Sequence, residues 1–166
     1  MKNLIFFMII FLVVIYKSKE AYPRNISLNI EIQEGNTTDL DFGSLKVMSE
    51  RGEPLTNFST RLVKISITNT TDFQYKVTQR LGGPVLNERD FELSSEIMTS
   101  FAFGAKTGTL LIQNPTPLSF AEQVIFVSDV RGEDDSFQLQ YNLAPFGKTN
   151  AGRYRSNIIY TVTTME

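Results

Sequence analysis

The chain contains no cysteine, no histidine and no tryptophan among its 166 residues. Without histidine, a Ser-His-Asp triad, a Cys-His dyad and a histidine-ligated zinc site are impossible. Without cysteine, the chain cannot form disulfides, thiolate metal sites or a lipid-anchored N-terminal cysteine. Without tryptophan, a sugar-binding site would lack its largest aromatic platform. These absences favour a non-enzymatic protein that needs no cofactor.

Neither sign of charge is in large excess. The chain has 16 Lys and Arg against 18 Asp and Glu, a net charge of −2, and the basic residues are scattered along it. A nucleic-acid partner requires a basic stripe that neutralises phosphates. We therefore expect no nucleic-acid partner, and the same dispersion argues against electrostatic attachment to an anionic membrane.

The N-terminal segment is typical of a secretory signal peptide. Lys2 supplies the positive region, and Leu4–Tyr16 is an unbroken apolar run that is short for a transmembrane helix. Cleavage after Ala21 or after Ser18 would follow. We expect residues 1–21 to be removed, no stable membrane span to remain, and the protein to reach the periplasm, the cell surface or the extracellular space. An uncleaved anchor and a buried core helix are the alternatives.

The remaining residues, 22–166, suffice for a single domain. Segments in which apolar and polar residues alternate predict half-buried strands. The clearest ones are Ile26–Gln33, Leu40–Val47, Leu62–Thr68, Phe73–Gln79, Gln123–Ser128, Phe137–Leu143 and Arg155–Thr164. With the shorter candidates, about seven to nine strands predict an all-β, immunoglobulin-like antiparallel β-sandwich.

Turn residues separate two neighbouring pairs of these strands. Asn69–Asp72 lies between the strands at Leu62–Thr68 and Phe73–Gln79, and Asp129–Ser136 lies between the next such pair. Polar turn clusters between alternating runs are typical of hairpins. We therefore expect two β-hairpins.

Both ends of the domain carry familiar patterns. Leu40–Gly43 follows an early strand, and Ala151–Tyr154 leads into a last strand that finishes Tyr160–Thr163. These segments resemble bacterial pilus subunits and spore-coat-U-type domains. The resemblance implies an exported immunoglobulin-like domain that is completed by an extended strand from a neighbouring subunit.

The first predicted strand carries a regular series of apolar side chains, Ile26, Leu28, Ile30 and Ile32, which we call the apolar ladder. One interpretation is an edge strand packed within its own domain. The other is a donor strand that adds to an exposed edge of another copy through main-chain hydrogen bonds.

Three further motifs have a plain structural interpretation beside a functional one. The acidic loop Asp129–Asp135 is either a solvated loop or a calcium site, since calcium prefers several carboxylate oxygens. Gly104–Thr107 echoes the end of a phosphate-binding loop but lacks its required glycines, so we expect a turn. Four N-x-[ST] sequons, at Asn25, Asn36, Asn57 and Asn69, would be glycan acceptors in a eukaryotic secretory pathway.

Two functional hypotheses follow. The first is a non-enzymatic exported structural or surface protein, a pilus-like or coat-like subunit that assembles with copies of itself or with related subunits. The second is a secreted module that binds a carbohydrate or another protein. Fold alone does not separate them, because function depends on sites carried by the fold.

Overall fold

The structure is a computed structural model that describes residues 24–33, 59–94, 98–143 and 152–165. The predicted signal segment, the strand predicted at Leu40–Val47 and the sequons at Asn36 and Asn57 lie outside the described residues. Among the residues described, none forms a helix with the length and apolar character needed to span a membrane.

The described residues form strands in all four segments. In chain order the strands are β1 (Ile26–Ile32), β2 (Ser59–Asn69), β3 (Tyr75–Leu81), β4 (Val85–Leu86), β5 (Glu92–Leu93), β6 (Met98–Phe103), β7 (Thr109–Leu110), β8 (Thr116–Pro117), β9 (Gln123–Val127), β10 (Asp135–Leu143) and β11 (Ile158–Thr164). Seven of them have five residues or more, and the two larger sheets together hold nine strands, within the predicted seven to nine.

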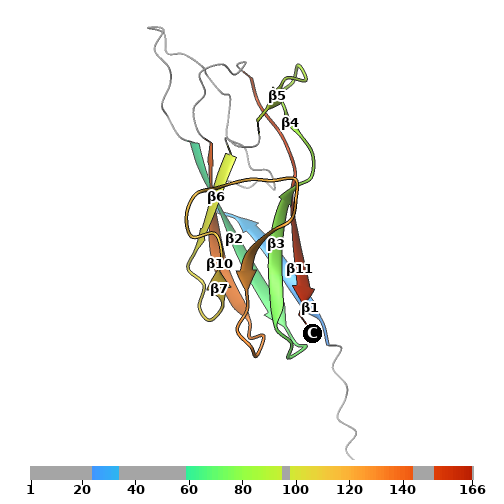
Figure 1. The fold of residues 1–166 in the computed structure, drawn as a ribbon, viewed down its shortest axis with the longest axis vertical. Coiled ribbons are helices and arrows are strands. Elements are labelled where there is room, and N and C mark those ends of the chain that lie inside the picture. The colour runs from blue at the N-terminus through green and yellow to red at the C-terminus, as the bar shows by residue number, and fades with distance from the viewer. Residues whose placement is uncertain (1–23, 34–58, 95–97, 144–151, 166) are drawn as a thin grey trace, which may run out of the picture.

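Two antiparallel sheets pack face to face (Figure 1). The five-stranded sheet has the order β1-β2-β10-β6-β8, and the four-stranded sheet has the order β11-β3-β9-β7. The short β4–β5 pair extends from one end of the sandwich. The predicted all-β, antiparallel β-sandwich is therefore confirmed.

Strict alternation along the strands builds the core between the sheets. In β10, every second residue from Asp135 to Leu143 is buried, and Phe137 is 1% exposed. Opposite it, β3 and β9 contribute Tyr75 and Phe126, both at 0% exposure. The Phe126 and Phe137 rings stack with centroids 4.9 Å apart, which joins the two layers.

Both predicted hairpins are wrong. β2 pairs with β1 and β10, whereas β3 pairs with β11 and β9, so Asn69–Asp72 crosses from one sheet to the other. The connection from β9 to β10 crosses back in the same way. Alternation specifies which face of a strand is buried but not which strand lies beside it, and turn residues serve crossings as well as hairpins.

Candidate functional site

The apolar ladder lies in the edge strand of its own sheet. β1 pairs with β2 over its whole length, and its side chains Ile26, Leu28 and Ile32 pack against the core. Ile30 is the exception, with 44% of its surface exposed. The structure thus shows the ladder packed within its own domain, and the donor role stays a proposal.

The main chain of β1 bonds to β2 through every second residue. The Gln33 N–H donates to the Leu62 carbonyl over 3.0 Å, and the Thr70 N–H donates to the Asn25 carbonyl over 2.9 Å. Because bonded and non-bonded residue pairs alternate in an antiparallel sheet, these two bonds set the phase of the strand. The N–H and C=O groups that face away from β2 therefore belong to Ile26, Leu28, Ile30 and Ile32.

A second long edge lies on β11, which carries no motif that marks it in the sequence. The Gly82 N–H donates to the Asn157 carbonyl over 2.7 Å, and the Met165 N–H donates to the Gln74 carbonyl over 2.6 Å. By the same alternation, the main-chain groups that face away from β3 belong to Ile158, Tyr160, Val162 and Thr164. The signal in the sequence is the absence of any charged residue from Ile158–Thr164.

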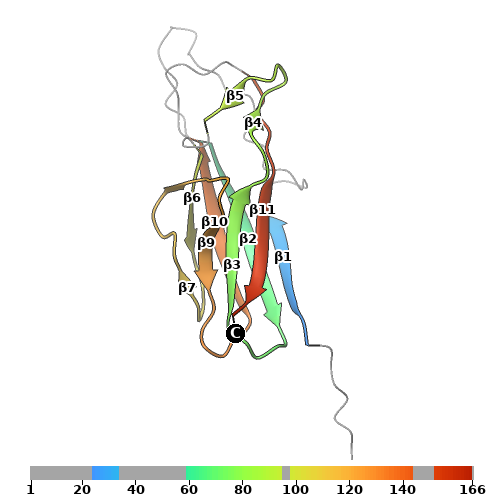
Figure 2. The same cartoon turned by 45° about the vertical axis from the view of Figure 1, so that its right-hand side comes forward.

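The two edges lie side by side on one flank of the sandwich (Figure 2). β1 begins and β11 ends at the same end of the molecule, so the two strands run in opposite directions (Figures 1 and 2). The core-facing side chains of both edges are only half-buried: Ile26, Leu28, Ile32, Ile158, Tyr160 and Val162. We call this flank the β1–β11 seam.

A buried polar network anchors the β11 side of the seam. The Tyr160 hydroxyl bonds to the Tyr141 hydroxyl, which donates to Gln79 Oε1 over 2.9 Å. Gln79 Nε2 in turn donates to Ser100 Oγ over 2.7 Å, so the network joins both sheets. Burial raises the pKa of Tyr160, which keeps its hydroxyl protonated and bonded at ordinary pH. The edge strand is held firmly through its side chain while its outer main chain has no partner among the described residues.

The acidic loop Asp129–Asp135 is built from hydrogen bonds rather than arranged around a cation. Asp135 is 4% exposed, and its two oxygens accept from the N–H groups of Lys106, Thr107 and Gly108, each over 2.9 Å. Burial raises the pKa of Asp135, but these bonds and that from Ser136 outweigh it and lower the pKa. The expected turn at Gly104–Thr107 falls in the loop between β6 and β7, which bends at residues 106–108 and binds this carboxylate through its N–H groups.

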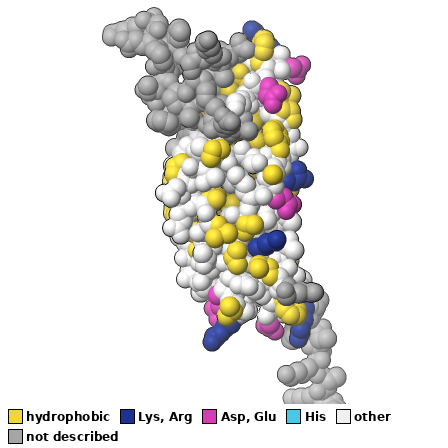
Figure 3. Space-filling view, in the orientation of Figure 1, with side chains coloured by type: hydrophobic (Ala, Val, Ile, Leu, Met, Phe, Trp, Pro, Cys, Tyr) yellow, Lys and Arg dark blue, Asp and Glu magenta, His cyan; other side chains and the backbone are white. Residues whose placement is uncertain are grey.

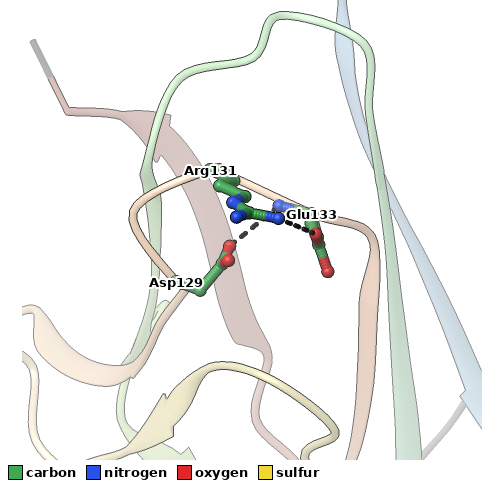
Figure 4. Close-up of polar contacts among 3 residues, drawn as sticks. All are labelled: Asp129, Arg131 and Glu133. Atoms are coloured by element: carbon green, nitrogen blue, oxygen red, sulfur yellow. Dashed lines mark hydrogen bonds and ion pairs between the residues drawn. The ribbon is translucent and has the colours of Figure 1, made fainter.

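The other acidic residues of the loop bond locally as well. Asp129 Oδ1 accepts from the Glu133 N–H over 3.0 Å, and Glu133 Oε1 lies 3.8 Å from Arg131 Nη1 (Figure 4). Asp134 Oδ1 accepts from the Asn69 N–H over 2.7 Å. In the part of the chain that the structure describes, no three acidic side chains converge on a position for a metal ion. The calcium hypothesis therefore gains no support from the loop geometry.

Asn69, one of the four sequon asparagines, holds the two sheet crossings together. Its Nδ2 donates to the carbonyls of Phe73 and Gly132, both over 2.9 Å, and its Oδ1 accepts from the Thr71 N–H over 3.0 Å. All the hydrogen-bonding groups of this amide are thereby used within the domain. Asn25, by contrast, is exposed.

Replacing Asn69→Asp should lower the free energy of unfolding by about 2–3 kcal/mol, because two donated bonds are lost and a carboxylate oxygen faces two carbonyls. Urea denaturation measures this change. Asn25→Asp is the matched control, since it alters an exposed sequon asparagine whose Oδ1 can still accept from Thr70. Equal losses in both variants would contradict the structural role of Asn69.

The β1–β11 seam thus presents outward main-chain groups and half-buried apolar side chains to a partner. Over the face shown in Figure 3, hydrophobic and charged side chains are interspersed, and neither sign of charge gathers into one patch. In comparisons with known proteins, the chain matches no family model and no curated protein sequence.

Proposed function

We propose that this chain is an exported, non-enzymatic structural subunit whose copies assemble by strand addition at the β1–β11 seam. The observation that carries the proposal is the outer edge of β11, which pairs with no other strand among the described residues. It presents a row of outward main-chain groups over seven residues, with no charged side chain and no proline along it.

Natural proteins protect long free edges with charges, prolines, bulges or a covering segment, because an unprotected edge pairs with other chains. β11 has neither a charged residue nor a proline, and its pairing with β3 is regular, without a bulge, over Ile158–Thr164. β1 carries one charged side chain, Glu31. An added strand would gain main-chain hydrogen bonds and would cover the half-buried side chains of the seam.

The oligomeric state of the mature chain, residues 22–166, tests this function. We expect light scattering after size-exclusion chromatography to show mass that increases with protein concentration. A strict monomer from micromolar to millimolar concentration would overturn the proposal. Sequencing the N-terminus of the protein recovered from its native host tests the export step separately.

The alternative function is a secreted module that binds a carbohydrate or another protein. This alternative predicts a monomer and a ligand site away from the seam. A stable monomer that binds a glycan or a protein partner would therefore favour it over assembly.

A further inference from the structure

The two edges of the β1–β11 seam match each other in length and in phase. Both strands have seven residues, Ile26–Ile32 in β1 and Ile158–Thr164 in β11. In each strand, the residues whose main-chain groups face outward also have their side chains on the core side of the sheet. Residues that pair across an antiparallel ladder place their side chains on the same face. β1 of one copy can therefore pair with β11 of a second copy and keep the apolar side chains of both strands on one continuous inner face.

Full overlap of the two strands sets a single register. Ile26 would pair with Thr164 of the second copy, and each following residue of β1 with the preceding residue of β11. Ile30, which exposes 44% of its surface, would then lie opposite Tyr160. A β-branched side chain opposite an aromatic one is a favourable cross-strand pair. This register thus covers the one residue of the apolar ladder that its own domain leaves exposed.

The charges on the outer face favour the pairing of β1 with β11. In this register Glu31 lies opposite Ile159 of the second copy, and Ile159 is paired with Arg80 in β3. The Cα atoms of Glu31 and of the second copy's Arg80 are then two strand spacings apart, about 10 Å, which these two long side chains can span. Opposite charges across neighbouring strands stabilise a sheet.

Pairing of like strands lacks this complementarity. If β11 paired with β11 around a two-fold axis at Thr161, Ile159 of one copy would lie opposite Thr163 of the other. Ile159 pairs with Arg80 and Thr163 pairs with Lys76, both in β3. Two cations would thus share one cross-strand row, with no acidic residue in either strand to separate them. Because β1 and β11 lie on one flank, pairing β1 with β1 would bring β11 to β11 as well.

We propose that β1 of one copy pairs with β11 of a second copy, in the register that sets Asn29 opposite Thr161. This inference rests on the proposed function, since it names the strands that strand addition joins. The two edges run in opposite directions on one flank (Figure 2). A two-fold axis parallel to the strands therefore lets the second copy's β1 pair with the first copy's β11 in turn. The five-stranded sheet of each copy then continues into the four-stranded sheet of the other.

Disulfide trapping tests both the strands and the register, because the chain has no cysteine of its own. Asn29 and Thr161 are exposed. In the proposed contact they form a non-hydrogen-bonded pair, in which the Cα atoms are about 4.5 Å apart and a disulfide fits. Mature chains with Asn29→Cys and with Thr161→Cys, one of them ¹⁵N-labelled, are mixed and mildly oxidised at a concentration at which the parent associates. Mass spectrometry should find linked dimers with one chain of each kind at least about tenfold above dimers of one kind, since the bond requires this geometry.

Ser27→Cys mixed with Thr161→Cys is the matched control. Ser27 is an exposed residue of the same strand, two residues out of the proposed register. This mixture should give much less linked dimer, and an equal yield would overturn the register. Linked dimers made only of Thr161→Cys chains, or only of Asn29→Cys chains, would overturn the inference and leave strand addition standing.

Two further outcomes separate this inference from the proposed function. Circular dichroism first establishes that each cysteine variant is folded. If folded variants associate like the parent but give no linked dimer in any mixture, the pairing of β1 with β11 is overturned while assembly stands. If the parent itself stays monomeric, the proposed function is overturned, and this inference with it.

Discussion

Val162→Pro in β11 is expected to abolish self-association of the mature chain while the domain stays folded. The Val162 N–H faces away from β3, so proline at this position breaks no bond of the sheet. It does remove a donor that an added strand would need, and edge strands tolerate proline where the N–H faces outward. Light scattering gives the mass, and far-UV circular dichroism shows that the fold persists.

Thr161→Pro is the matched control, one residue away. The Thr161 N–H faces β3, so this variant should lose a sheet hydrogen bond and unfold more easily. Ile30→Pro makes the corresponding outward change in β1 at a half-exposed position. Loss of association in both Ile30→Pro and Val162→Pro would indicate that β1 pairs with β11 of another copy. Loss in Val162→Pro alone would indicate that β11 pairs with β11. Association that survives in folded Val162→Pro would exclude the β11 edge as the contact.

Asp135→Asn is expected to give the largest loss of stability, about 3 kcal/mol at neutral pH. The two carboxylate oxygens accept from four main-chain N–H groups, those of Lys106, Thr107, Gly108 and Ser136. An asparagine has only one acceptor oxygen, so donors that are now bonded would be left without partners. For a domain of this size the melting temperature should fall by about 10 °C.

The effect of this substitution should depend on pH. The hydrogen bonds lower the pKa of Asp135 below its unfolded value of about 3.9, so the unfolded chain binds a proton more readily. The stabilisation is therefore complete above the unfolded pKa and is lost as the pH falls through the folded one. The difference between parent and variant should be largest at neutral pH and should shrink in acid.

Asp134→Asn provides the comparison for this prediction. It removes the same charge from the neighbouring residue, and the asparagine oxygen can still accept from the Asn69 N–H. We expect little change in its melting temperature. The role of the Asp135 carboxylate would be contradicted if Asp135→Asn lowered the melting temperature no more than Asp134→Asn does. It would also be contradicted if the loss for Asp135→Asn were the same at all pH values.

Strand positions and their buried faces were predictable from the sequence. Alternate residues of Phe137–Leu143 are buried, and Ile158, Tyr160 and Val162 in the predicted strand Arg155–Thr164 pack against the core. Neighbours in the sheets were not predictable. The Asn69–Asp72 segment has the composition of a hairpin turn, yet it crosses between the sheets, and its Asn69 amide bonds to the other crossing.

The sequence alone was enough to predict the all-β fold class. The missing cysteine and histidine remove whole classes of chemistry, and residues that alternate every second position can bury one face only as strands. The positions of the two edge strands follow only from the folded chain. Which main-chain groups remain outside a sheet, and which side chains meet at its end, depend on contacts between residues far apart in the chain. Such contacts bring Leu86 to Arg155 and β3 to β11, and no local pattern encodes them.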